Sequence, residues 1–214
     1  MIKNLVFDLG GVLVPLNRIA CIRAFDSVVG YKNFGEVLHQ YRQLGFFDQF
    51  ETGKISARKF RQIIKGDAAP VVNGKPHVVT DREIDYSLNC YLGEIPQDKI
   101  DTLLFFKNDY RMLMLSNTNP IGMKKCRQLF LDKGYKIESL FEKQYLSYKM
   151  KMAKPNREIF EKMIKDAKIL PEETLYIDDS PANIAMGKEL GFHVLLYNPK
   201  EDLYVKISEY LERQ

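Results

Sequence analysis

Cysteine is scarce in this chain of 214 residues, which contains only three. Cys21, Cys90 and Cys126 are widely spaced and form no CxxC pair, so we expect three reduced thiols in a cytoplasmic protein. The three histidines likewise lack the spacing of metal ligands.

Long apolar runs and charge of one sign are also lacking. No run approaches the roughly 18 apolar residues that a membrane span needs. The N-terminal stretch LVFDLGGVLV carries Asp8 in its middle and has no small-residue cleavage site, which disfavours a secretory signal. The balance of 32 basic against 28 acidic residues is too mild to indicate nucleic-acid binding. With 45% hydrophobic residues, the chain has room for one sizeable core and a smaller second lobe.

Short apolar runs predict strands that are buried on both faces. Such runs occur at residues 5–7, 111–115, 175–177 and 194–196. Helices are predicted after Pro120, after Pro155, over residues 181–190 and at the C-terminal end. Strands that alternate with helices predict an α/β fold with a doubly wound parallel sheet.

The pattern is purely helical between the first strand and the second, apart from a loop predicted at residues 66–76. We therefore expect residues 1–15 and 109–214 to form the core and residues 16–108 to form an inserted α-helical cap. Residues 46–56 of this cap are expected to line the substrate cavity.

Four groups of polar residues fall at strand ends, the edge where open parallel sheets bind ligands. They are Asp8, the pair Ser116-Asn117, Lys154, and the pair Asp178-Asp179 with Asn183 one turn further on. Each group alone also suits a turn, a helix cap or a surface position. Together, three carboxylates would repel one another unless a cation shared the site. Carboxylate oxygens favour a hard divalent ion, Mg²⁺ above all, and a lysine with a hydroxyl donor could then hold a phosphoryl group.

These segments are similar to the four motifs of the haloacid dehalogenase-like hydrolase superfamily, subfamily I. FDLGGVL (7–13) resembles the first motif, LSN (115–117) the second, the lysine of AKP (153–155) the third and YIDDSPANI (176–184) the fourth. The combination is similar to the bacterial alpha-glucose-1-phosphatase-like branch and to the phosphatase lobe of soluble epoxide hydrolase. FETGKIS (50–56) resembles the substrate loop of that group. The resemblance covers essentially the whole chain and implies a Rossmann-like core with a helical cap.

The resemblance implies an Mg²⁺-dependent phosphatase that acts on a small phosphorylated metabolite such as a sugar phosphate. Asp8 would be the nucleophile and would form an aspartyl-phosphate. Mg²⁺ would be held by Asp8, the backbone carbonyl of Gly10 and Asp179, with Asp178 ligating directly or through water. Lys154 would be catalytic by neutralising charge on the phosphate and the nucleophile.

The same resemblance implies which residues bind the substrate. The phosphoryl group would be bound by Leu9, Gly10, Ser116, Asn117 and Lys154. We expect no nucleic-acid or membrane partner, and the sequence leaves open whether the protein is a monomer or a homodimer.

One position departs from the family pattern. The usual aspartate two residues after the nucleophile, a general acid for the leaving group, is replaced by Gly10. General acid catalysis is typically worth about 10²–10⁴-fold. Either the leaving group needs little protonation, or the cap supplies an acid, for which Asp48, Glu51 and His39 are candidates, or turnover is lost.

Three alternative functions stay open at this point. A dehalogenase could use the same aspartate without a metal, although the tandem Asp178-Asp179 would then be hard to explain. A phosphonate-cleaving enzyme would need a cap lysine, for which Lys54 and Lys59 are available. A phosphate-binding or regulatory protein without turnover would account for Gly10.

Overall fold

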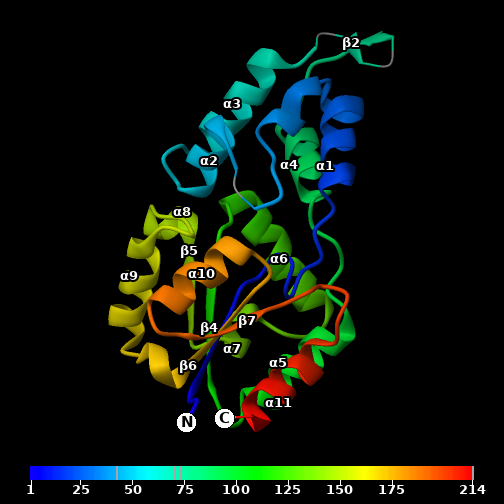
Figure 1. Cartoon of the computed structure of the whole chain (residues 1–214). Coiled ribbons are helices and arrows are strands. Elements are labelled where there is room, and N and C mark those ends of the chain that lie inside the picture. Colours follow the sequence, from blue (N-terminus) through cyan, green and yellow to red (C-terminus); the bar gives the residue numbers. More distant parts are fainter. Residues whose placement is uncertain (42, 70, 73, 214) are drawn as a thin grey trace.

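Five parallel strands form the central sheet, in the order β5-β4-β1-β6-β7 (Figure 1). The computed structural model describes residues 1–41, 43–69, 71–72 and 74–213. The strands of the sheet are β1 (Asn4–Phe7), β4 (Arg111–Ser116), β5 (Lys143–Leu146), β6 (Thr174–Asp178) and β7 (His193–Leu196).

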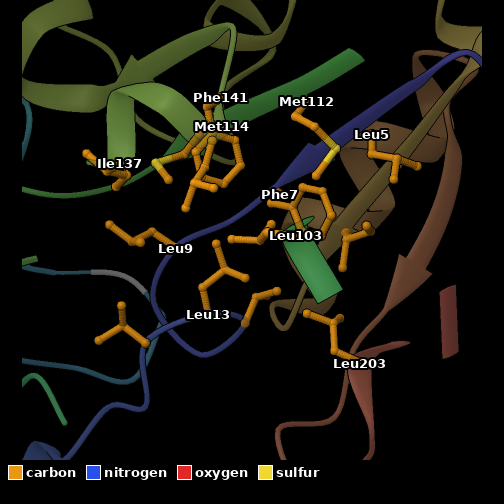
Figure 2. Close-up of a cluster of buried hydrophobic side chains, with 14 of the residues drawn as sticks. Leu5, Phe7, Leu9, Leu13, Leu103, Met112, Met114, Ile137, Phe141 and Leu203 are labelled. Carbon is orange, nitrogen blue, oxygen red and sulfur yellow. The ribbon is translucent and has the colours of Figure 1, made fainter. Parts of the chain in front are cut away.

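Each face of this sheet has its own apolar core, because successive side chains of a strand point to opposite faces. Phe7 and Met114 lie in one cluster, part of which Figure 2 shows. Val6 and Leu113 lie in the other. The first face is covered by α5 (Gln97–Phe106), α6 (Pro120–Asp132), α7 (Ile137–Leu140) and α11 (Leu203–Glu212), and the second by α9 (Arg157–Ala167) and α10 (Pro181–Glu189). The prediction of a doubly wound α/β core is therefore confirmed.

The strand β5 is an element that the sequence pattern did not predict. It is an edge strand of four residues, and its first two, Lys143 and Gln144, are only half-buried. A short edge strand with a charged start lacks the continuous apolar run that marks the central strands.

The cap lies beyond the carboxyl ends of the strands, away from both chain termini (Figure 1). Its interior is aromatic. The rings of Phe25 and Phe34 stack with centroids 3.6 Å apart, and those of Phe50 and Phe60 with centroids 4.4 Å apart. The cap helices are α1 (Arg18–Ala24), η1 (Phe25–Val29), η2 (Lys32–Glu36), α2 (Gly45–Glu51), α3 (Ala57–Asp67) and α4 (Asp81–Asn89).

The loop predicted at residues 66–76 includes the last turn of α3 and a short antiparallel pair. The pair consists of β2 (Val71–Val72) and β3 (Lys75–Pro76). Pro70 and Asn73 of this predicted loop lie outside the described residues.

Two linkers connect the cap to the core, and they are hydrogen-bonded to each other. The backbone N–H of Asn17 donates to the carbonyl of Tyr91 at 2.7 Å, and that of Gly93 donates to the carbonyl of Pro15 at 2.8 Å. The entry and exit of the cap therefore form one paired hinge.

The helix α5 follows this hinge, and its buried side chains belong to the cluster under the sheet. It also packs against α11, the last helix of the chain. The expected boundary at residues 108 and 109 places α5 in the cap, and the packing argues for an earlier one. We propose that the cap comprises residues 16–92.

Among the described residues, no helix is both long and apolar enough to cross a membrane.

Candidate active site

The carboxyl ends of β1, β4 and β6 bring the predicted polar residues together. Asp8 directly follows β1, and Asp178 ends the neighbouring β6. Lys154, from the loop before α9, reaches between them, with Nζ 3.0 Å from Asp8 Oδ1 and 2.6 Å from Asp178 Oδ2. Its ammonium also donates to the carbonyl of Leu115 at 2.9 Å. One buried cation thus links the two acidic strand ends.

Lys154 remains charged in this position. Burial acts to lower its pKa, but Asp178 and Asp8 more than offset this effect, so the pKa of Lys154 is raised. Only 1% of its side chain is exposed. The site therefore contains a positive charge whose position is fixed by three oxygen partners.

Asp178 is fully occupied by hydrogen-bond donors. Its Oδ1 accepts from the backbone N–H of Ser180 at 2.8 Å and from Asn183 Nδ2 at 3.0 Å. Its Oδ2 accepts from Lys154 and from the hydroxyl of Tyr176. Four donors match the roughly four lone pairs of a carboxylate. Tyr176 was missed from the sequence, although residues 176 and 178 of a strand share one face.

Asp8, Asp178 and Asp179 each offer a carboxylate oxygen within 4.8 Å of the others. Burial raises the pKa of Asp8 to about 7, and Asp178 and Asp179 add to the rise against the opposing effect of Lys154. Burial and Asp178 raise the pKa of Asp179 to about 6. Three carboxylates thus face one ammonium, and this excess negative charge would be offset by a cation. An all-oxygen donor set fits Mg²⁺.

The position of Asp179 depends on Gly11. Gly11 has a φ of +78°, which favours glycine, and a Cβ at this residue would lie 2.3 Å from Asp179 Oδ2. Any side chain here would displace the carboxylate. The sequence signal for this requirement was the second glycine of the pair that closely follows Asp8.

The residues expected to bind phosphate all line one cavity, which includes Leu9, Gly10, Ser116, Asn117 and Lys154 in its wall. Several of them already make hydrogen bonds within the protein, as described for Lys154 above. The N–H of Leu9 donates to Asp8 Oδ1 at 2.7 Å. The side-chain amide of Asn117 makes two 2.9 Å hydrogen bonds with the backbone of Lys154, so it holds the lysine loop in place.

The cavity lies between the strand ends and the cap and has a volume of about 80 Å³. A water molecule needs roughly 10–15 Å³ by this measure, so the enclosed space suits a small molecule. The cap contributes Gln40, Tyr41, Gln43, Glu51, Leu88 and Tyr91 to the wall. Of the segment 46–56, which was expected to line the cavity, Glu51 is the one residue found in the described wall.

The lining of the cavity distinguishes among the three candidate cap acids. Glu51, the last residue of α2, faces the cavity, whereas Asp48 and His39 are not among its described lining residues. Burial, followed by the charge of Asp48, raises the pKa of Glu51 to about 8. A hydrogen bond from Asn119 opposes this rise and the charge of Asp8 adds to it.

The space beside Gly10 is already filled. A Cβ built on Gly10 would lie 3.2 Å from Cδ1 of Leu16, closer than ordinary van der Waals contact. Leu16 belongs to the hinge, where it pairs with Leu92. An apolar side chain therefore occupies the position beside the nucleophile loop where the family pattern has a carboxylate.

Comparisons with known proteins show which proteins this chain resembles. The family model described as haloacid dehalogenase-like hydrolase matches residues 2–191. The curated protein D-ribitol-5-phosphate phosphatase of Bacteroides thetaiotaomicron is 39% identical over 193 residues, which cover 90% of each chain.

Two solved structures resemble the whole chain. A wild-type HAD family enzyme from Bacteroides thetaiotaomicron, in complex with magnesium and inorganic phosphate, is 40% identical with a TM-score of 0.86. The match covers 95% of this chain and 98% of that chain. A predicted HAD-like family hydrolase from Porphyromonas gingivalis is 38% identical with a TM-score of 0.89, and the match covers 100% of both chains.

Proposed function

Because this chain belongs to the haloacid dehalogenase-like hydrolase family, we propose that it is an Mg²⁺-dependent phosphatase that hydrolyses the monophosphate of a small sugar or polyol. One observation carries this proposal: a buried lysine and three carboxylates converge on a small cavity that the cap covers. The relative that acts on D-ribitol-5-phosphate supports the polyol class of substrate.

In the first half of the reaction, a carboxylate oxygen of Asp8 attacks the phosphorus atom. The bond between phosphorus and the ester oxygen breaks, and an aspartyl-phosphate forms. Lys154, 3.0 Å from Asp8, reduces the repulsion between the anionic nucleophile and the anionic phosphoryl group. In the second half, water attacks the phosphorus, which releases inorganic phosphate and regenerates Asp8.

Asp8, Asp179 and the backbone carbonyl of Gly10 are the groups we propose to hold Mg²⁺. The four donors on Asp178 argue that this residue acts through water and by orienting Lys154. When bound, the ion neutralises charge on the phosphoryl oxygens.

Polar side chains of the cap suit a hydroxylated substrate. Gln40, Tyr41 and Gln43 line the cavity wall opposite Lys154, and amide and hydroxyl groups can both donate to and accept from substrate hydroxyls.

The alternative functions receive less support. A dehalogenase needs no cation, so it would not account for the cluster of three carboxylates. Lys54 and Lys59 are exposed and are not among the described residues of the cavity wall, which disfavours a Schiff base for phosphonate cleavage.

The test is release of inorganic phosphate from a panel of polyol phosphates, sugar phosphates and p-nitrophenyl phosphate. We expect release with Mg²⁺, none with chelator and none from Asp8→Asn. Release that persists in excess chelator would contradict the metal requirement, and release by Asp8→Asn would contradict the role of the nucleophile. Halide release from 2-haloacids would favour the dehalogenase.

A further inference from the structure

Hydrolysis of an alkyl phosphate needs a proton for the departing oxygen, since an alkoxide is a poor leaving group. The loop that carries the nucleophile has no side chain to supply this proton. Gly10 stands at the relevant position and Leu16 fills the space beside it. The proton must therefore come from elsewhere in the cavity wall.

We propose that Glu51 of the cap is the general acid and protonates the leaving-group oxygen. This inference rests on the proposed phosphatase function. Among the described lining residues, Glu51 is the one carboxyl group outside the cluster at the strand ends. It is also supplied by the cap, whereas Asp8 is supplied by the core.

Three contacts hold the backbone around Glu51 against the core. The hydroxyl of Ser147 donates to the carbonyl of Glu51 at 2.6 Å. Gly53 has a φ of +62° and comes so close to α8 (Ser147–Met150) that a Cβ would lie 2.2 Å from the carbonyl of Tyr148. The ammonium of Lys151 donates to the carbonyl of Gly53. Glu51 is thus positioned by the contact that closes the cap.

The side chain of Glu51 also interacts with Asn119. Asn119 is hydrogen-bonded to Glu51, and its own Oδ1 accepts from the N–H of Gly122 at 2.8 Å as the N-cap of α6. Its Nδ2 is therefore the group that donates to Glu51.

The surroundings of Glu51 favour the protonated form. Burial comes first, and Asp48 on its own helix and Asp8 below it add negative charge. Tyr91, on the linker, faces it as a neutral phenol because burial raises the pKa of that hydroxyl. The nearby cation Lys151 is engaged with a backbone carbonyl. With a pKa of about 8, Glu51 is protonated at neutral pH, as a general acid must be.

Other hydroxyl and thiol groups in the wall are weaker acids. Burial raises the pKa of the Cys126 thiol to about 12 and also raises that of Tyr91. A pKa near the working pH makes proton transfer most effective, and among the described wall residues outside the cluster at the strand ends this favours Glu51.

In the proposed reaction, Glu51 donates one proton in the first half and recovers one in the second. As the bond between Asp8 and phosphorus forms and the ester bond breaks, the proton of Glu51 moves to the departing oxygen and leaves an alcohol and the Glu51 carboxylate. In the second half, this carboxylate accepts a proton from the attacking water. Glu51 then returns to its protonated form.

The experiment compares Glu51→Gln with the matched variant Asp26→Asn, which removes an exposed carboxyl of the cap outside the described cavity wall. Substrates are a polyol phosphate, with a poor leaving group, and p-nitrophenyl phosphate, with a good one. We expect Glu51→Gln to lower kcat/KM for the polyol phosphate by about 10²–10⁴-fold and for p-nitrophenyl phosphate by less than about 10-fold. Asp26→Asn should stay within about 3-fold of the wild type on both.

A second readout is the pH profile. The wild type should lose kcat on the polyol phosphate as the pH rises through the pKa of Glu51, whereas Glu51→Gln should lose this alkaline limb. Equal losses on both substrates would overturn the proposal and indicate a positioning role for Glu51. A wild type that releases phosphate from polyol phosphates but is unaffected by Glu51→Gln would overturn the proposal alone. A wild type inactive on every phosphate ester would overturn the phosphatase function and this inference together.

Discussion

Substitution of Asp8, the proposed nucleophile, should stabilise the metal-free protein. Burial and its acidic neighbours raise the pKa of Asp8 from 3.8 to about 7 in the fold. Below about pH 4 the carboxyl is protonated in both the folded and unfolded states, so it contributes no penalty. Between about pH 4 and 7 only the unfolded state loses its proton, so stability falls as the pH rises. Above about pH 7 the penalty is complete.

The magnitude follows from the size of the shift. Each pKa unit corresponds to about 1.4 kcal/mol, so a shift of about 3 units gives an upper bound of about 4 kcal/mol. This net shift already includes the attraction of Lys154. Asp8→Asn removes the charge with little change in shape. We therefore expect it to raise the free energy of unfolding at pH 8 by about 2–4 kcal/mol.

The assay is urea unfolding of the wild type and Asp8→Asn in excess chelator, at several pH values from 4 to 8. The difference in unfolding free energy should be near zero at pH 4 and should grow towards pH 8. In saturating Mg²⁺ the advantage of Asp8→Asn should shrink, because the cation offsets the charge of Asp8. A difference that is independent of pH, or a less stable Asp8→Asn at pH 8 in chelator, would refute this reasoning.

Three further outcomes are expected. Gly11→Ala should displace Asp179 and raise the Mg²⁺ concentration needed for half-maximal phosphatase activity by more than about 10-fold, which corresponds to about 1.4 kcal/mol. Gly66→Ala is the control, because a Cβ at Gly66 has open space, and it should leave this concentration unchanged. Gly53→Ala should separate the cap from the carbonyl of Tyr148 and raise KM for the phosphate substrate, and an unchanged KM would argue that the contact is dispensable. Addition of Mg²⁺ at 100 times its Kd should raise the free energy of unfolding by about 2.7 kcal/mol. The increase would be measured as a higher Tm, and a Tm unaffected by Mg²⁺ would contradict the metal site.

The core and the clustered residues could be predicted because both follow from short-range pattern. Apolar runs mark the central strands, and the parallel order places Asp8 and Asp178 at the same edge. The edge strand β5 was not predicted, because a half-buried strand resembles a loop in its composition. The end of the cap is not marked in the sequence, since α5 follows the cap helices directly along the chain, and its packing against α11 and the cluster under the sheet is what associates it with the core.

The division of roles within the site depended on partners that no spacing could show. Asp178 and Asp179 are adjacent in sequence, yet four donors surround the first, while the second lies against Gly11. We propose that the first carboxylate thereby orients Lys154 and that the second is left to hold a cation. Asn117, which we expect to bind phosphate, also holds the backbone of Lys154 through its side-chain amide.

In the proposed mechanism the general acid is Glu51 of the cap, whereas the family pattern has an aspartate at the position of Gly10, beside Asp8. An acid beside the nucleophile would be present whether the cap is open or closed. We propose that an acid on α2 is kept at the cavity by the contacts of Gly53 and Ser147 between the cap and α8. Proton donation would then be available only in the closed state, from which bulk water is excluded. This coupling predicts that Ser147→Ala, which removes the 2.6 Å hydrogen bond to the Glu51 carbonyl, lowers turnover of polyol phosphates more than that of p-nitrophenyl phosphate. Steady-state kinetics on the two substrates measure the ratio, and equal effects on both would show that cap closure and proton donation are independent.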